Sequence, residues 1–90
     1  MPSSVVGQAL LEGDGCVCMA PTGNGDKPHD VRTERCCGRK GGIMQNTVNF
    51  WDRGNFYCYF QAGIDASNWD QDCCRKWYGD GTYGYCNRAT

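Results

Sequence analysis

Two adjacent cysteines lie within the segment Ser67–Gly79, which reads SNWDQDCCRKWYG and predicts the better of two short helices. The first serine can accept a hydrogen bond from an unpaired first-turn amide, and Asp70 completes a variant of the capping box. Acidic residues come early and basic residues late, which complements the helix dipole. Because Trp69, Cys73 and Trp77 recur at i, i+4 and i+8, we expect one apolar stripe with both tryptophans in the core.

A second adjacent pair, Cys36-Cys37, predicts a similar but weaker helix over residues 30–37. Asp30 lies six residues before this pair, the same offset as the capping serine of the other segment, and it is predicted to cap the helix. A glycine, Gly41, follows the pair, as Gly79 follows the other one. Both segments are therefore expected to be capped helices that end near glycine, with their cysteines towards the C-terminal half.

Between the two helices the hydrophobic period changes to two, which is the period of a strand. Phenylalanine and cysteine alternate with tyrosine over residues 56–60, and apolar residues alternate with polar ones over residues 47–50. Residues 52–55, Asp-Arg-Gly-Asn, are typical of a turn. The two runs are therefore predicted to form a hairpin.

Two further strands are predicted near the ends of the chain, at Cys16–Ala20 and Thr82–Cys86, with a loop over Pro21–Pro28. The order is then β-α-β-β-α-β, the split βαβ arrangement. We predict an α+β fold in which two short helices cover one face of a disulfide-stapled, four-stranded antiparallel sheet.

Eight cysteines in ninety residues are typical of a disulfide scaffold from an oxidising compartment. Adjacent cysteines on a helix point about 100° apart, so each needs a different partner. We predict four disulfides and no free thiol, with each helical cysteine bonded to a strand cysteine. The predicted strand cysteines are Cys16, Cys18, Cys58 and Cys86, and the helical ones are Cys36, Cys37, Cys73 and Cys74.

No catalytic, metal or cofactor site is expected. The cysteine spacing lacks the C-x₂₋₄-C pattern of zinc sites, and the single histidine, His29, is predicted to be a solvated residue beside a helix start. Asp70 and Asp72 are two residues apart on a helix and face different directions, so they suit the helix dipole better than general acid–base chemistry. The sequence therefore indicates a protein that is not an enzyme.

Charge and hydropathy exclude several classes of partner. The chain has 9 Lys and Arg against 10 Asp and Glu, a formal net charge of −1. This balance argues against a strongly basic nucleic-acid binder and a cationic membrane-lytic peptide. No apolar run approaches the roughly 20 residues that a spanning helix needs, so no membrane insertion is expected.

Two groups of residues are candidates for binding. Trp51, Tyr57 and Tyr59 are expected to be the most exposed aromatics and to form a face suited to a protein partner. Arg35, Arg39 and Lys40 form a small basic cluster, which suits the helix C-terminus better than an anionic ligand. The aromatic residues also leave open a carbohydrate-binding module that stacks sugar rings.

The cysteine and glycine pattern resembles that of small secreted cysteine-rich proteins of filamentous fungi. It consists of Cys36-Cys37 with Gly41-Gly42, the lone Cys58, Cys73-Cys74, and the ending Tyr83-Gly84-Tyr85-Cys86. The βαββαβ order is similar to the killer-toxin-like subset of these proteins. The resemblance implies an extracellular effector or elicitor that meets a plant host through a host protein or receptor. It carries over no catalytic residues, and an antimicrobial, killer-toxin-like activity is the other alternative.

Residues 1–15 are predicted to form an N-terminal arm that precedes the single domain, residues 16–90. The arm lacks the features of a secretory signal, so we expect a mature secreted chain. It carries Val5-Val6 and Leu10-Leu11 outside the disulfide framework. We expect it to add as a strand either to its own sheet or to that of a second copy. Addition to a second copy would give a two-fold homodimer. The alternative is a frayed terminus.

Overall fold

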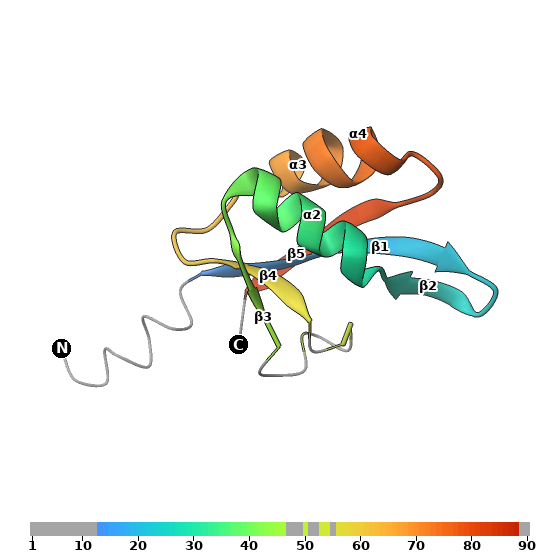
Figure 1. The fold of residues 1–90 in the computed structure, drawn as a ribbon, viewed down its shortest axis with the longest axis horizontal. Helices are drawn as coiled ribbons and strands as arrows, with labels where there is room; N and C mark the ends of the chain where they lie inside the picture. The colour runs from blue at the N-terminus through green and yellow to red at the C-terminus, as the bar shows by residue number, and fades with distance from the viewer. Residues whose placement is uncertain (1–12, 47–49, 51–52, 55, 89–90) are drawn as a thin grey trace, which may run out of the picture.

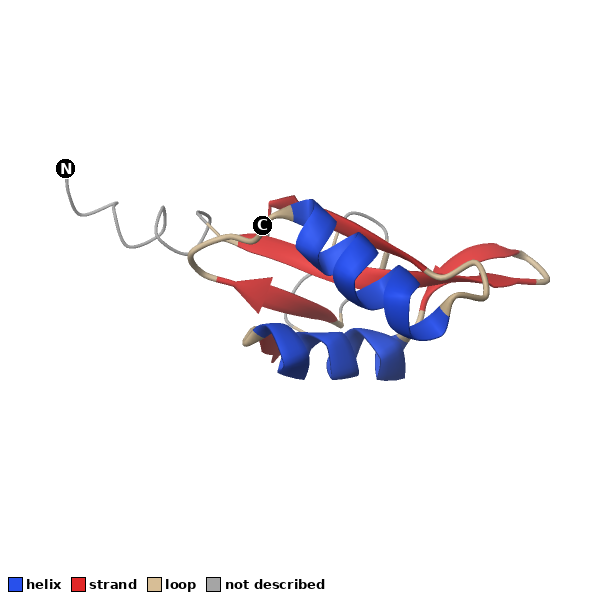
Figure 2. Cartoon of the chain, turned by 90° about the horizontal axis from the view of Figure 1, so that it is seen from above, coloured by secondary structure: helices blue, strands red, loops and turns tan. Residues whose placement is uncertain are grey.

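An antiparallel sheet of five strands carries both helical segments on one face (Figure 1), which confirms the α+β fold predicted from the sequence. The structure is a computed structural model that describes residues 13–46, 50, 53–54 and 56–88. Seen from above, the two helical segments lie side by side over the same face of the sheet (Figure 2). The N-terminal arm is outside the described residues, apart from residues 13–15.

The long strand β1 (Asp14–Thr22) is the centre of the sheet. Along one edge, its first six residues pair with β5 (Tyr83–Arg88). Along the other edge, its start pairs with β4 (Tyr57–Phe60) and its end with β2 (Gly25–Pro28), while β3 (Ile43–Gln45) pairs with the far side of β4. All pairs are antiparallel. With β2 set aside, the order β5-β1-β4-β3 is that of the predicted split βαβ arrangement.

The segment predicted to be the loop Pro21–Pro28 is instead a hairpin. The residue pair Thr22 and Gly25 closes it, which leaves Gly23 and Asn24 as a two-residue turn. Glycine and asparagine suit such turns because they tolerate backbone conformations that other residues avoid. The hairpin adds β2 as a fifth strand to the four that were predicted.

The strand that precedes β4 was also placed wrongly. The sequence predicted it over residues 47–50, but β3 occupies that edge of β4, with Ile43 opposite Tyr59. Residues 47–49 lie outside the described residues. Phe50 is not in a strand. Its amide donates a hydrogen bond to the carbonyl of Gly54 (2.7 Å), and its side chain is fully buried. Phe50, the one described residue of this run, is therefore a buried residue outside the strands.

The first helix, α2 (Asp30–Lys40), extends three residues beyond its predicted end. His29 caps it, because the amide of Arg32 donates to His29 Nδ1 (3.3 Å). The expected cap at Asp30 is wrong, because the residue before it is the cap. His29 is a half-buried capping residue and not the solvated neighbour that was expected. Gly41 ends the helix in the left-handed conformation (φ 79°), as its predicted place near the helix end requires.

The second helical segment contains a wider turn in its middle. It runs through α3 (Ala66–Trp69), η1 (Asp70–Cys74) and α4 (Arg75–Tyr78), and η1 is a π-helix in which the amide of Arg75 donates to the carbonyl of Asp70, five residues back. Asp65 caps the segment in place of the predicted serine, since the Ser67 amide donates to its side chain (2.9 Å). Gly79 ends the segment, in the left-handed conformation.

Only one of the two predicted core tryptophans, which lie on either side of the π-turn, is in the core. No residue of α4, the last turn of the segment, is buried. Trp69, before the turn, is fully buried, whereas Trp77, after it, is 53% exposed. The expected apolar stripe thus ends at the cysteines, and the expectation that Trp77 is core is wrong.

All eight cysteines are paired, which confirms the four predicted disulfides. The helix–strand rule holds for two of them and is wrong for the other two. Cys16 and Cys86 are directly opposite each other on neighbouring strands, and Cys36 and Cys73 join the two helices, which lie close enough to be bridged. The four bonds are Cys16–Cys86, Cys18–Cys74, Cys36–Cys73 and Cys37–Cys58.

Two small cores lie on opposite faces of β1. Between the sheet and the helices, the cystines surround Trp69, whose indole N–H donates to the carbonyl of Val17 (2.9 Å). On the other face, Phe50 stacks on Tyr57 with ring centroids 4.8 Å apart. Gly15 makes room for this second core, because a Cβ there would lie 2.4 Å from the Phe50 ring. The alternation of side chains along β1 supplies both cores.

Candidate interaction surface on the helix pair

The disulfide Cys36–Cys73 joins α2 to η1 and fixes the spacing of the two helical segments. Arg39 lies three residues after the first cysteine of this bond, and Trp77 lies four residues after the second. The guanidinium carbon of Arg39 is 4.1 Å from the centroid of the Trp77 ring, a cation–π contact. An exposed indole is therefore held under a cation at the junction of the helices.

Three charged side chains lie beside this contact. Lys40 Nζ is 2.6 Å from a carboxylate oxygen of Asp72, and Lys76 Nζ is 3.8 Å from the other oxygen. Lys76 Nζ also lies 5.6 Å from the Trp77 ring centroid. The hydrogen bond from Lys40, followed by the charges of both lysines, lowers the pKa of Asp72. One ionised carboxylate is thus shared by two lysines.

Arg35 completes the group. It is exposed on α2, one turn before Arg39 and about 40° around the helix axis from it. We call these six residues the Trp77 surface. It consists of Arg35, Arg39, Lys40, Asp72, Lys76 and Trp77.

At the start of α2, Arg32 also contacts the second helical segment. Its guanidinium lies 4.8 Å from the ring centroid of Tyr78, bonds Asp80 (2.9 Å) and donates to Thr82. Hydrogen bonds from Arg32 and Thr82 lower the pKa of Asp80 to about 2. Arg32 is therefore engaged in contacts within the protein, whereas Arg39 and Lys40 of the Trp77 surface lie at the opposite end of α2.

The structure separates the two predicted groups of binding residues. The basic residues Arg35, Arg39 and Lys40 lie together on α2. The last two also contact the second helical segment, through Trp77 and Asp72 respectively. The predicted aromatic face does not form among the described residues: Tyr57 is buried against Phe50, so its expected exposure is wrong. Tyr59 is half-buried against the second core, and Trp51 lies outside the described residues.

The residues considered for catalysis have structural contacts. His29 caps α2 through its ring nitrogen. Asp70 accepts hydrogen bonds from Arg75 Nε (2.8 Å) and from the amide of Gly84 (2.7 Å), which fastens η1 to β5. Asp72 bonds Lys40, as described above. The two carboxylates thus serve different contacts, in agreement with their expected divergence on the helix.

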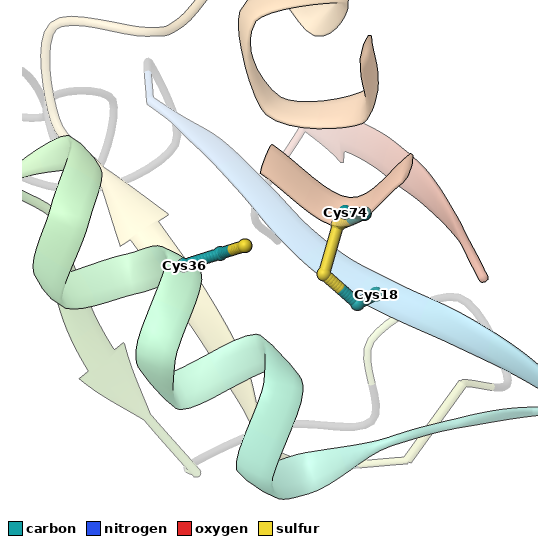
Figure 3. A group of neighbouring side chains, drawn as sticks. All are labelled: Cys18, Cys36 and Cys74. Atoms are coloured by element: carbon teal, nitrogen blue, oxygen red, sulfur yellow. A yellow bond between two sulfur atoms is a disulfide. The ribbon is translucent and has the colours of Figure 1, made fainter. Parts of the chain in front are cut away.

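Three cysteine sulfurs gather in the core like the ligands of a metal ion. The Sγ atoms of Cys18, Cys36 and Cys74 all lie within 4.8 Å of one another, and Cys36 points towards the Cys18–Cys74 bond (Figure 3). Metal binding requires thiolates, however, and each of these sulfurs is already in a disulfide. The cluster is the close approach of two disulfides, so its donor set does not fit a metal.

Comparisons of the chain with family models, curated proteins and solved structures gave no match. Among the described residues, no helix is both long and apolar enough to cross a lipid bilayer. The Trp77 surface is the part of the described surface where a large exposed aromatic ring and several cations lie together.

Proposed function

We propose that this chain is a secreted, non-enzymatic protein that acts as an effector or elicitor on a plant host and binds a host protein through the Trp77 surface. The observation that carries the proposal is the exposure of Trp77 under Arg39 on a disulfide-joined pair of helices. Tryptophan and arginine are the residues most enriched among those that dominate binding energy at protein interfaces.

Rigidity supports the same role. A side chain that is ordered before binding loses less conformational entropy when a partner arrives. Cys36–Cys73 holds the two helices, and the contact with Arg39 holds the Trp77 ring. The surface is therefore preorganised for recognition, whereas an apolar side chain exposed by chance needs no such support.

Secretion is supported by the disulfide framework. Seven of the eight cysteines are buried, and Cys86 is half-buried. Structural disulfides of this density form and persist in oxidising compartments and are rare in the cytosol. The cysteine and glycine pattern that resembles fungal secreted proteins agrees with an extracellular location.

The carbohydrate-binding alternative is less well supported. A sugar ring stacks on the open face of an aromatic side chain, but Arg39 lies over the face of Trp77, and Tyr57 is buried. The same exposed tryptophan still makes polysaccharide binding the alternative that an experiment has to exclude. A killer-toxin-like activity has no specific contact in its favour.

Infiltration of the purified, oxidised protein into plant tissue tests the proposal, with ion leakage and reactive oxygen as readouts. The reduced and alkylated protein is the control, because it keeps the sequence but loses the helix pair. We expect a response to the oxidised protein alone. Retention on insoluble chitin or cellulose without a tissue response would favour the sugar-binding module, and inhibition of microbial growth would favour the antimicrobial one.

We also propose that two copies associate through the N-terminal arm. Among the described residues, β5 pairs only with β1, and β3 pairs only with β4, so each has an outer edge with backbone groups available. Such edges accept an added strand. The apolar arm that carries Val5-Val6 has the composition for it.

A further inference from the structure

We infer that the partner of the Trp77 surface is an acidic stretch of polypeptide, in which an apolar side chain packs on the exposed part of Trp77 and neighbouring carboxylates meet Arg39 and Lys76. The inference rests on the proposed function and names the chemistry of the partner.

The Trp77 surface has a local excess of positive charge on a chain whose net charge is −1. It holds four cationic side chains, Arg35, Arg39, Lys40 and Lys76, against the single carboxylate of Asp72. Complementary charge across an interface steers association and selects partners. A negatively charged partner is therefore favoured at this site.

Other carboxylates of the helical layer do not cancel this excess. Asp70 is bonded to Arg75, and Asp80 is bonded to Arg32 at the start of α2. Asp65 caps α3. Glu34 lies about 140° around α2 from Arg39, so it faces a different side of the helix.

The contact between Arg39 and Trp77 also leaves the donors of arginine available. A guanidinium that lies over an aromatic ring uses its face, while its N–H groups point outward in its plane. Those groups match the two oxygens of a carboxylate. A carboxylate bound by Arg39 would thus lie next to the exposed indole, which calls for an acidic residue beside an apolar one in the partner.

A nucleic acid fits this arrangement less well. Non-specific binding to nucleic acid needs repeated contacts between cations and phosphates along a groove or stripe. Here the excess charge comes from the four cations of the Trp77 surface, which holds a single exposed indole. A short acidic segment of protein matches both the charge and the size of such a spot.

Selection from a library of short random peptides displayed on phage tests the inference without a known receptor. The library is first depleted on oxidised Trp77→Ala protein and then selected on the oxidised wild-type protein, so that the recovered peptides require Trp77. We expect them to contain an excess of aspartate and glutamate around an aromatic or aliphatic residue. Neutral or basic peptides would overturn the inference while leaving the Trp77 surface as a binding site. If no peptide is recovered, both the inference and the surface are overturned.

The recovered peptides are then measured by fluorescence anisotropy against charge variants. Arg39→Gln should weaken their binding at least about fivefold, while Lys27→Gln, which removes an exposed cation on β2, should change it less than about twofold. Equal effects of the two variants would show attraction to overall charge and would overturn the inference. A single-stranded oligodeoxynucleotide that displaces the peptides at equal concentration would show a general anion site and would also overturn it.

Discussion

The guanidinium of Arg39 lies 4.1 Å from the ring centroid of Trp77, although the two residues are on different helices. The disulfide Cys36–Cys73 is the reason that this contact can persist, since it ties the helices within one turn of both residues. A contact between two exposed side chains alone would contribute little to stability. In this protein the contact holds the indole ring of Trp77 in a fixed position beside a positive charge.

Quenching of tryptophan fluorescence should reveal this positive charge. Iodide gathers near cations and caesium is repelled by them, so iodide should quench Trp77 better than caesium does. Trp69 is fully buried and contributes little to either measurement. We expect the iodide-to-caesium ratio of quenching constants to fall at least about twofold in Trp77→Phe and to fall less in Arg39→Gln.

Trp51 is present in all three proteins, so its contribution does not account for a difference between them. A ratio that is the same in the wild type and in Trp77→Phe would contradict the electrostatic environment described for the Trp77 surface.

The close approach of two core disulfides predicts exchange between them when one is opened. In Cys73→Ser, the Cys36 thiolate is left within 4.8 Å of both sulfurs of the Cys18–Cys74 bond. Its attack would form a bond from Cys36 to Cys74 or to Cys18 and would release the other cysteine as a thiolate. At alkaline pH, alkylation followed by peptide mapping should find the free thiol distributed over these three cysteines within hours.

Cys36→Ser is the matched control, because it opens the same disulfide and leaves Cys73 as the thiol. Cys73 is not a member of the cluster of three mutually close sulfurs. The label should therefore stay mainly on Cys73. Label that remains confined to Cys36 in the first variant would show that the sulfurs cannot reach one another.

Asp80 should titrate well below an ordinary aspartate. Its pKa is lowered from 3.8 to about 2, first by the hydrogen bond from Arg32 and then by that from Thr82. Because the folded pKa lies below the unfolded one, the contact stabilises the fold above the unfolded pKa, and this contribution is lost as pH falls towards 2. Carboxyl NMR titration should show this pKa, and Arg32→Gln should return it most of the way to 3.8. An unchanged pKa in Arg32→Gln would exclude Arg32 as the main cause.

The N-terminal arm predicts a change of oligomeric state on truncation. Light scattering should give a dimer mass for the full chain at micromolar concentration and a monomer mass for a chain that starts at Glu12. A monomeric full chain would exclude the dimer. A dimer that survives truncation would assign the contact to another surface.

The sequence predicted the order of the main elements because their signals are local. Alternation over residues 56–60 marked β4, and glycines marked both helix ends. The β1–β2 hairpin was missed although its signal was present, since Gly23-Asn24 is a typical two-residue turn. The three-residue strand β3 is too short to show a clear alternation.

The candidate site could not be predicted from the sequence, because it depends on where the burial of the second helical segment ends and on one disulfide. The i, i+4, i+8 pattern predicted Trp77 in the core with Trp69, but α4, the last turn of the segment, has no buried residue and leaves Trp77 at the surface. Adjacent cysteines showed that each needs its own partner, but which sulfurs meet is decided by how the helices pack. The bond Cys36–Cys73, which brings Arg39 to Trp77, therefore contradicted the helix–strand rule.

The most direct test of whether the Trp77 surface carries the activity is a dose measurement in infiltrated plant tissue. The quantity measured is the dose of protein that gives a half-maximal response. The comparison is between Trp77→Ala and Val31→Ala, since Val31 is 52% exposed on α2 and Trp77 is 53% exposed on α4. Each variant is first shown by mass and peptide mapping to hold the four disulfides. We predict that Trp77→Ala raises the dose at least about tenfold, as for the loss of a dominant interface residue, while Val31→Ala changes it less than about twofold. Equal doses for Trp77→Ala and the wild type would contradict the account.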